Sequence, residues 1–243
     1  MKGEKAERIE GQIDEIRETL GILESNLPRQ LDGYALSRKS KLPWKVLLYR
    51  EALIWRVVEL GKSALESFVN DQFVSGIVLT RAAVETSAAL WYLSAKVDAV
   101  VDSKMLGDVD EYLMKLAMGT ATGWAETNSS TGVLTMPRPI KIGAFLKQVE
   151  KDVEGFSHQY GVLSEYAHPN WAGTVLLYSD TNKQKAITDF GHNMRKAENA
   201  KAVGVANLSV ALKMFDLKYD HIGDLIPAFI TVCEARSDKR PDS

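Results

Sequence analysis

The sequence predicts an all-α protein: a helical bundle of about seven or eight helices, with one small β-hairpin near residues 174–191. Apolar residues recur at helical spacing over several long segments. Hydrophobic residues make up 45% of the chain and charged residues 26%, a balance typical of soluble globular proteins. No internal repeat of about 20–50 residues occurs, so a solenoid is not expected.

Residues 4–27 are expected to form an amphipathic helix. From Ile9 to Leu27, isoleucines and leucines recur alternately four and three residues apart, which is the seam of a heptad repeat. The seam covers fewer than four heptads, too few for a long free coiled coil, and Pro28 ends it. We therefore expect residues 1–28 to pack on the rest of the chain or to form a dimer with a second copy.

Two further long helices are expected at residues 44–69 and 72–97, separated by a short polar break. Before Lys96, the second of these segments carries only two charged residues, Arg81 and Glu85. A helix that is apolar nearly all round is typically buried at the centre of a protein. We therefore expect residues 72–97 to form the central helix of the bundle.

The second half of the chain is expected to be helical with two exceptions. Residues 119–137 are rich in Gly, Ser and Thr, and a loop of this length is usually functional or disordered, or conceals a short helix. The segments TVLLYSD and KAITDFG, separated by TNKQ, are expected to pair as the hairpin at 174–191. The expected helices are 108–118, 140–151, 155–168, 194–219 and a last one from Asp224, its N-cap, to about Arg236. Residues 29–236 then form a single domain, followed by a frayed tail at 237–243.

Composition indicates a cytoplasmic protein that does not enter the membrane. Cys233 is the only cysteine, so no internal disulfide can form and a reducing compartment is expected. Its apolar surroundings indicate a small buried hydrophobe rather than a catalytic thiol. The N-terminal segment is charged and lacks the apolar core of a signal peptide, and no window approaches the ~18 uncharged apolar residues of a membrane span. A net charge of −2 opposes whole-surface attraction to nucleic acid but permits a local basic patch.

Gly61-Lys62-Ser63 resembles the end of a phosphate-binding loop, but two features exclude that assignment. Such a loop requires a glycine five residues before the Gly-Lys pair, where Arg56 stands. It also requires a preceding strand, whereas this tripeptide lies inside a predicted helix. Gly61 is expected instead to permit close contact between two helices.

Arg81 and Glu85 lie one helical turn apart and therefore share a face of the predicted central helix. Two interpretations are open. A buried ion pair would fix the register of the helix, because burying either charge alone is unfavourable. Alternatively, this face lines a cleft in which Arg81 binds an anion such as a phosphate and Glu85 orients it.

The stretch YGVLSEYAHPNWAG, residues 160–173, places Glu165 and His168 on the same face of a helix. Pro169 disfavours the α conformation at His168 and so fixes that residue at the helix C-terminus. Helix-end carbonyls favour the imidazolium, which suits a general acid or an anion-binding group. The alternative is that His168 only caps the helix. Further candidate binding residues around it are Ser164, Asn170, Trp171 and Trp124.

Glu165 and His168 have the spacing of one half of a di-metal carboxylate site. Such a site needs a second Glu-x-x-His, and no other histidine follows a glutamate at that spacing. No Gly-x-Ser-x-Gly elbow occurs, and Ser164 lies too close to His168 on one helix for a catalytic triad. The sequence therefore predicts neither a metal site nor a cofactor.

Two segments together, GIVLTRAAVETSAALWYL and YGVLSEYAHPNWAG, resemble a family of uncharacterised bacterial proteins related to the HEPN group, the higher eukaryote and prokaryote nucleotide-binding helical domains. The resemblance covers roughly residues 45–180. In that family an Arg-x-x-x-Glu helix precedes a Ser-Glu-x-x-His-Pro helix end. The matching residues here are Arg81, Glu85, Ser164, Glu165, His168 and Pro169.

The resemblance implies a helical bundle that is commonly dimeric and, in many members, a metal-independent ribonuclease of a toxin–antitoxin or phage-defence system. The catalytic signature of HEPN domains is an Arg followed, after four to six residues, by a His on one helix. This chain departs from that signature, because residues 139–194 contain no arginine before or after His168. The departure therefore opposes ribonuclease activity more than it opposes the fold.

Two functional hypotheses follow. In the first, the protein acts on RNA or a nucleotide: His168 exchanges protons with the substrate, Arg81 holds the phosphate, and Glu85 and Glu165 orient them. In the second, the protein is a non-catalytic helical dimerisation or interaction module, in which the polar residues fix helix ends. A homodimer without cofactor or metal is expected under both.

Overall fold

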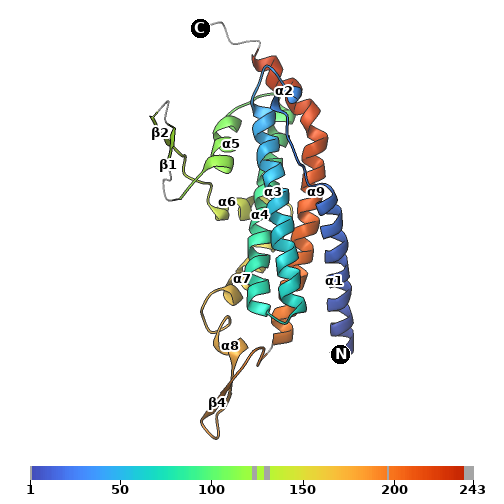
Figure 1. Cartoon of the computed structure of the whole chain (residues 1–243), viewed down its shortest axis with the longest axis vertical. Coiled ribbons are helices and arrows are strands. Elements are labelled where there is room, and N and C mark those ends of the chain that lie inside the picture. The colour runs from blue at the N-terminus through green and yellow to red at the C-terminus, as the bar shows by residue number, and fades with distance from the viewer. Residues whose placement is uncertain (1, 122–124, 129–131, 196, 238–243) are drawn as a thin grey trace.

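The computed structural model describes residues 2–121, 125–128, 132–195 and 197–237. Within these residues the chain forms nine helices and two antiparallel two-stranded hairpins, so the predicted all-α bundle with a small hairpin is confirmed. Four long helices run along the length of the molecule (Figure 1). They are α1 (Lys2–Ser25), α3 (Leu42–Val69), α4 (Phe73–Ser103) and α9 (Ala197–Ser237).

Shorter elements cover the sides and the ends of this bundle (Figure 1). Two of them, α2 and α8, are helical turns of four residues. The helices are α2 (Gly33–Leu36), α5 (Val109–Met118), α6 (Ile142–Glu150), α7 (Phe156–Ala167) and α8 (Val175–Tyr178). The strands are β1 (Ala125–Asn128), β2 (Gly132–Thr135), β3 (Ser179–Asn182) and β4 (Ile187–Phe190).

Helix α4 is the centre of the bundle, as its apolar sequence predicts. Helices α3 and α9 pack along it, and α6 and α7 cover part of its remaining surface. Residues 88–94 are all buried, and the Ser87 hydroxyl donates to the Ala211 carbonyl of α9 at 2.8 Å. By length and composition α4 could cross a membrane, but 61% of its apolar window is buried inside the protein, as in the core helix of a soluble protein.

Glycines allow the long helices to approach closely. A Cβ at Gly76 or Gly204 would lie 2.6 Å or 2.3 Å from the Phe68 ring, so neither position can hold a side chain without moving that ring. Phe68 of α3 is thereby enclosed between α4 and α9 and is fully buried. At Gly61 a Cβ would lie 2.8 Å from Leu20, which confirms that this glycine permits a helix contact.

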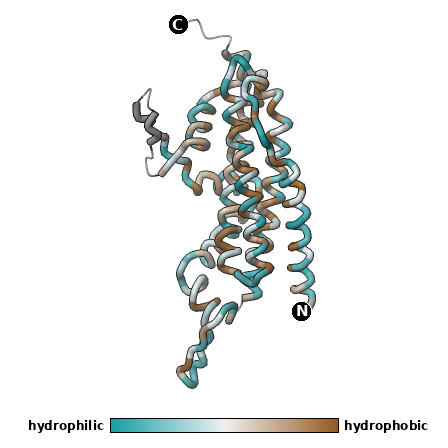
Figure 2. The backbone as a smooth tube through the Cα atoms, in the orientation of Figure 1, coloured by the Kyte–Doolittle hydropathy of each residue, from teal (hydrophilic) through white to brown (hydrophobic). Residues whose placement is uncertain are grey.

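Helix α1 docks on its own chain, the first of the two arrangements that its heptad seam allows. The helix is largely hydrophilic in Figure 2, yet its seam is buried against α3 and α9. Ion pairs flank this contact, from Lys62 to Glu24 and from Lys213 to Glu15. The buried seam residues are Ile9, Ile13, Ile16, Leu20 and Leu23. The same seam therefore cannot also bind a second copy without α1 leaving the bundle.

Helix α9 corrects the prediction of two helices, one at 194–219 and one starting at Asp224. The helix is continuous and contains Pro227, so Asp224 lies inside it and caps nothing. Proline lacks the N–H that would complete the helical hydrogen bond, but packing against α3 and α4 offsets this loss. Buried residues on both sides of the proline are Ile222, Ile226 and Phe229.

The hairpins also differ from the prediction. Strands β1 and β2 lie within 119–137, where only a loop or a short helix was expected. The second hairpin spans 179–190 instead of 174–191, because VLLY forms the helical turn α8. Leu176 and Leu177 are both buried. A helical turn allows this, whereas successive side chains of a strand point to opposite faces, so only one of the two would be buried.

Two predicted boundaries also change. Helix α4 continues to Ser103, past the expected end at residue 97, and its added turns bury Val100. The predicted tail, 237–243, lies outside the described residues apart from Ser237, which ends α9.

Ile16→Ala tests whether α1 is part of the folded core. Ile16 is fully buried, so we expect the truncation to lower the free energy of unfolding by about 2–5 kcal/mol in a urea titration. Ile22→Ala is the matched control, because Ile22 is 46% exposed on the same helix and should change stability by less than about 0.5 kcal/mol. Equal stability of both variants and wild type would show that α1 does not dock in solution.

Cys233 is fully buried, as its apolar surroundings predict. Burial raises the pKa of its thiol to about 11, so the neutral thiol dominates at neutral pH. Because the pKa of the thiol is higher in the folded protein than in the unfolded chain, the thiol stabilises the folded state at pH values below the unfolded pKa of 9.0. This stabilisation is lost as the pH rises through the pKa of the folded protein, about 11. At pH 8 we expect no reaction with a disulfide reagent until urea unfolds the chain. Rapid reaction of the folded protein would contradict this burial.

Candidate functional site

Helix α7 and the turn that follows it carry most of the predicted site residues, and α7 lies against α4. The Trp91 Nε1 donates to Asp152 Oδ2 at 2.9 Å, just before α7 begins, whereas Arg81 contacts Tyr160 inside α7. Later residues of α7 therefore meet earlier residues of α4, so the two helices run antiparallel. This orientation brings the Arg-x-x-x-Glu segment beside the first half of α7.

Arg81, Glu85 and Tyr160 form one hydrogen-bonded group, which we call the α4–α7 clamp. Arg81 donates to the Tyr160 hydroxyl from Nε at 3.1 Å and from Nη2 at 2.9 Å. The same hydroxyl donates to Glu85 Oε1 at 2.6 Å, and Arg81 Nε lies 3.3 Å from that oxygen. Tyr160 thus connects both charged groups of α4 to α7.

The α4–α7 clamp is partly exposed and is therefore not a buried ion pair. The side chains of Arg81 and Glu85 are 29% and 36% exposed, so water screens the pair, which by itself contributes about 0–1 kcal/mol. Burial, and next the hydrogen bond to Glu85, raises the pKa of Tyr160, while Arg81 opposes this shift. Tyr160 therefore remains protonated at neutral pH and can keep donating to Glu85.

The other polar residues of the predicted site form a turn at the end of α7. Glu165 accepts a hydrogen bond from Asn170 Nδ2 at 2.7 Å. Asn170 Oδ1 accepts from the backbone N–H groups of Ala172 and Gly173 at 3.0 and 3.1 Å. Ser164 donates to the Tyr160 carbonyl within the helix. These bonds fix where the chain turns after α7.

His168 is the C-cap of α7, as Pro169 predicts. Its backbone is extended, with φ −82° and ψ 151°, and its N–H donates to the Ser164 carbonyl. The imidazole is exposed, and it has no hydrogen bond or ion pair among the described residues. A Cβ at Gly173 would lie 2.2 Å from the His168 carbonyl oxygen, so only glycine lets the chain fold back on this helix end.

The predicted residues thus fall into two groups instead of one centre. His168 follows Tyr160 by eight residues, which corresponds to about 12 Å along an α-helix. Within the described part of the chain, no hydrogen bond or ion pair joins His168 to Arg81 or to Glu85. Trp171, three residues after His168, is 59% exposed. Trp124 lies outside the described residues.

Sequence reasoning missed Tyr160, although a signal was present. Tyr160 opens the stretch 160–173 and lies one helical turn before Ser164, so the spacing placed it on the face of interest. Among the described residues, no group of three or more His, Cys, Asp or Glu side chains could hold a metal ion.

A second group of the same composition joins α3 to α9. Arg50 donates from Nε and Nη2 to the Tyr219 carbonyl at 3.0 and 2.8 Å, and the Tyr219 hydroxyl donates to Glu51 at 2.6 Å. Arg50 and Glu51 also form an ion pair, with side chains only 11% and 14% exposed. Burial, and next the Glu51 bond, raises the pKa of Tyr219. Arg, Tyr and Glu therefore connect helices at two places in this fold.

By fold and site, the chain is an all-α bundle whose candidate site is a helix–helix contact with an exposed helix end. No protein-family model matches it, and no significant match occurs among curated proteins or solved structures. The functional argument therefore depends on the contacts described above.

Tyr160→Phe tests the α4–α7 clamp. Removal of the hydroxyl leaves Arg81 and Glu85 without their shared partner, so we expect a loss of about 1–2 kcal/mol in unfolding free energy. Tyr34→Phe is the matched control, because Tyr34 is 83% exposed. Urea denaturation followed by circular dichroism measures both variants. If Tyr160→Phe is as stable as Tyr34→Phe, the clamp does not hold α7 on α4.

Proposed function

We propose that the protein is a non-catalytic helical interaction module that self-associates through one end of the bundle. The interacting surface, which we call the distal surface, is formed by α8, the β3–β4 hairpin and the turns beside them. Its exposed apolar side chains are Trp171, Val175, Tyr178, Ile187, Phe190 and Met194. This concentration of apolar side chains within residues 171–194 is the observation that carries the proposal.

The predicted catalytic residues support binding over bond cleavage, because most of them have a structural role. Arg81 and Glu85 connect α4 to α7, and Glu165 and Asn170 fix the turn after α7. An acid–base ribonuclease would need His168 and Arg81 at one phosphate. Their separation along α7 opposes that arrangement.

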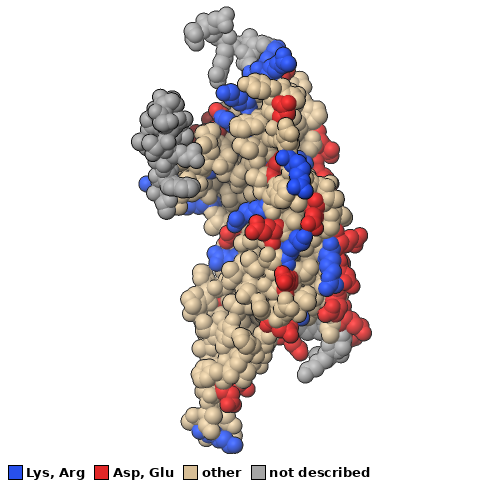
Figure 3. All heavy atoms as spheres, in the orientation of Figure 1, with Lys and Arg blue, Asp and Glu red and all other residues tan. Residues whose placement is uncertain are grey.

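The distal surface has the properties of a docking surface. Phe190 is 80% exposed, Trp171 59% and Ile187 53%. Figure 3 shows few charges over α7 and α8, whereas acidic and basic side chains cover the outer face of α1. Exposed apolar patches of this kind in soluble proteins mark sites of protein interaction.

The β3–β4 hairpin favours a second copy of the chain as the partner. Residues 180–190 are all exposed, and the hairpin projects from the end of the bundle (Figure 1). An isolated two-stranded hairpin is marginally stable, and its open edges are templates for pairing with another chain. Two lysines and two aspartates on this segment balance in charge, so two copies do not repel each other: Lys183, Lys185, Asp180 and Asp189.

An RNA- or nucleotide-directed activity, which the HEPN resemblance suggests, is the second candidate. The observation that favours it is that Arg81 remains 29% exposed and its Nη1 has no partner among the described residues. His168 is exposed at the end of the same helix pair. Incubation of wild type and His168→Ala with single-stranded RNA in chelator separates the candidates. Cleavage by wild type alone would establish the enzyme and overturn the non-catalytic proposal.

Sedimentation velocity of wild type and of the double variant Trp171→Ser/Phe190→Ser tests the proposed function. We expect wild type to form a dimer and the double variant to sediment as a monomer, because two exposed aromatic side chains supply much of the apolar contact. Met105→Ser is the control, since Met105 is 61% exposed beyond the far end of α4 and should leave the dimer intact.

A monomeric wild type at about 100 μM would contradict self-association, since stable dimers bury large surfaces and bind more tightly than this. A double variant that remains dimeric would place the interface elsewhere. Unfolding midpoints of all three proteins establish that the substitutions act on association and leave the fold intact.

A further inference from the structure

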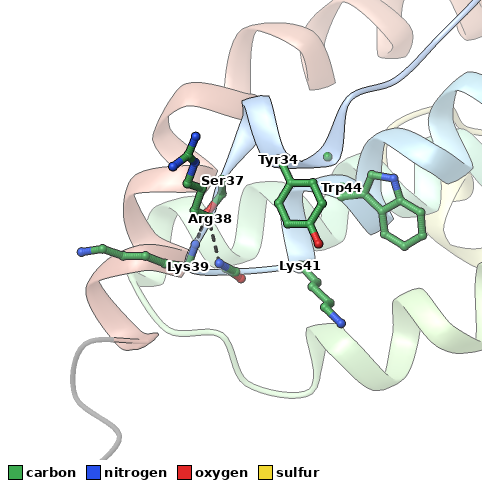
Figure 4. A pocket seen from close by; sticks show the side chains of 8 residues that line it. Tyr34, Ser37, Arg38, Lys39, Lys41 and Trp44 are labelled. Atoms are coloured by element: carbon green, nitrogen blue, oxygen red, sulfur yellow. Dashed lines mark hydrogen bonds between the residues drawn. The ribbon is translucent and has the colours of Figure 1, made fainter.

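A pocket of about 410 Å³ opens at the end of the bundle opposite the distal surface. It lies where the connection between α1 and α3 passes over the start of α3, close to α2 (Figures 1 and 4). Its lining residues are Gly33, Tyr34, Ser37, Arg38, Lys39, Ser40, Lys41 and Trp44. Its volume is within the range of ligand sites in proteins, about 300–1,000 Å³.

Local hydrogen bonds hold the backbone of this pocket in place. Asp32 caps α2 by accepting from the N–H groups of Tyr34 and Ala35 at 2.9 and 3.1 Å. Ser37 Oγ accepts from the N–H groups of Lys39 and Ser40 and donates to Glu234 of α9 at 2.7 Å. The pocket wall is therefore anchored to the end of α9 and is formed before any ligand binds.

Two aromatic rings line the pocket. A Cβ at Gly33 would lie 2.8 Å from Trp44 Cδ1, so the indole packs directly on the backbone at Gly33. Tyr34 is 83% exposed, which is unusual for a large aromatic side chain. In Figure 4 the Tyr34 ring lies beside the indole, and the Lys41 side chain extends away from both rings on the side of the Tyr34 hydroxyl. Such rings can stack on a planar group of a ligand.

The pocket is also cationic. Arg38, Lys39 and Lys41 line it, and none of its lining residues is acidic. Asp32 and Glu234 accept the hydrogen bonds that hold the wall, and neither is among the lining residues. In the described part of the chain, no ion pair is formed by Arg38 or Lys41. Their charges are therefore available to an anion.

We propose that this pocket binds a small phosphate ester that carries a planar ring, the chemistry of a nucleoside monophosphate. The ring stacks on Tyr34 and Trp44, and the phosphate binds Lys41, because lysine binds phosphate through charge-assisted hydrogen bonds. The site uses no residue of the α4–α7 clamp or of the distal surface. It is therefore a second binding function, independent of the proposed self-association.

Isothermal titration calorimetry with adenosine monophosphate tests the proposal, with adenosine and inorganic phosphate titrated in parallel. We expect the monophosphate to bind with a dissociation constant below about 1 mM, and adenosine or phosphate alone to bind at least about tenfold more weakly. Lys41→Met and Tyr34→Ala should each weaken binding about tenfold or more, through loss of the charge and of the stacked ring.

Two controls separate this site from the rest of the molecule. Lys185→Met removes an exposed lysine at the tip of the β3–β4 hairpin and should leave binding unchanged. Trp171→Ser/Phe190→Ser should also bind as wild type does, so failure of self-association and failure of the pocket are distinguished. Unfolding midpoints show that each variant is folded.

Four results would overturn the proposal. Absence of binding at about 5 mM monophosphate would show that the pocket has no such ligand. If adenosine bound as tightly as the monophosphate, the basic side chains would contribute nothing to recognition. If inorganic phosphate bound as tightly as the monophosphate, the aromatic rings would contribute nothing. Unchanged binding by Lys41→Met would place the site elsewhere.

Discussion

The burial of α4 between α3 and α9 is the constraint on which the rest of the structure depends. Residues 88–94 are buried without a break, and the transfer of apolar surface from water is the dominant favourable contribution to folding. Close approach of the three helices requires glycine at Gly76 and Gly204, where Phe68 occupies the space of the missing side chains. Every functional feature is placed by this core. Helix α7 takes its position from the side of α4, and the distal surface extends from the end of α7.

Polar side chains in this protein connect helices that the apolar core has already brought together. The same chemistry occurs in the α4–α7 clamp and in the group of Arg50, Glu51 and Tyr219. In each, a tyrosine hydroxyl donates a hydrogen bond to a glutamate that also forms an ion pair with an arginine. The more buried of the two, between α3 and α9, lies away from the predicted site. Its presence supports a structural role for the same trio at Arg81. The two surfaces at which we propose binding, the distal surface and the pocket at Tyr34, have no such connections.

The sequence predicts the elements whose determinants are local and misses those set by distant contacts. The seam from Ile9 to Leu23 is visible as periodicity, and the nearly uncharged run of α4 as composition. Both helices form, although α4 extends past its expected end. Pro227 indicates a break by local rules, yet packing on α3 and α4 overrides it. Tyr160 is separated from Arg81 and Glu85 by 79 and 75 residues, so no spacing rule could join them. The ion pair between Arg81 and Glu85 was predicted correctly from their spacing of one helical turn. Whether Arg81 lies beside His168 cannot be read from the sequence, and no hydrogen bond or ion pair joins these two described residues.

A double-mutant cycle between Glu85→Ala and Tyr160→Phe tests the central claim, that the polar residues of the predicted site hold α7 on α4. Urea unfolding of wild type, the two single variants and the double variant gives the coupling free energy between the two side chains. The direct bond at 2.6 Å predicts a favourable coupling of about 1 kcal/mol or more. Additive effects within about 0.3 kcal/mol would contradict the claim, since the two side chains would then act independently in the folded protein.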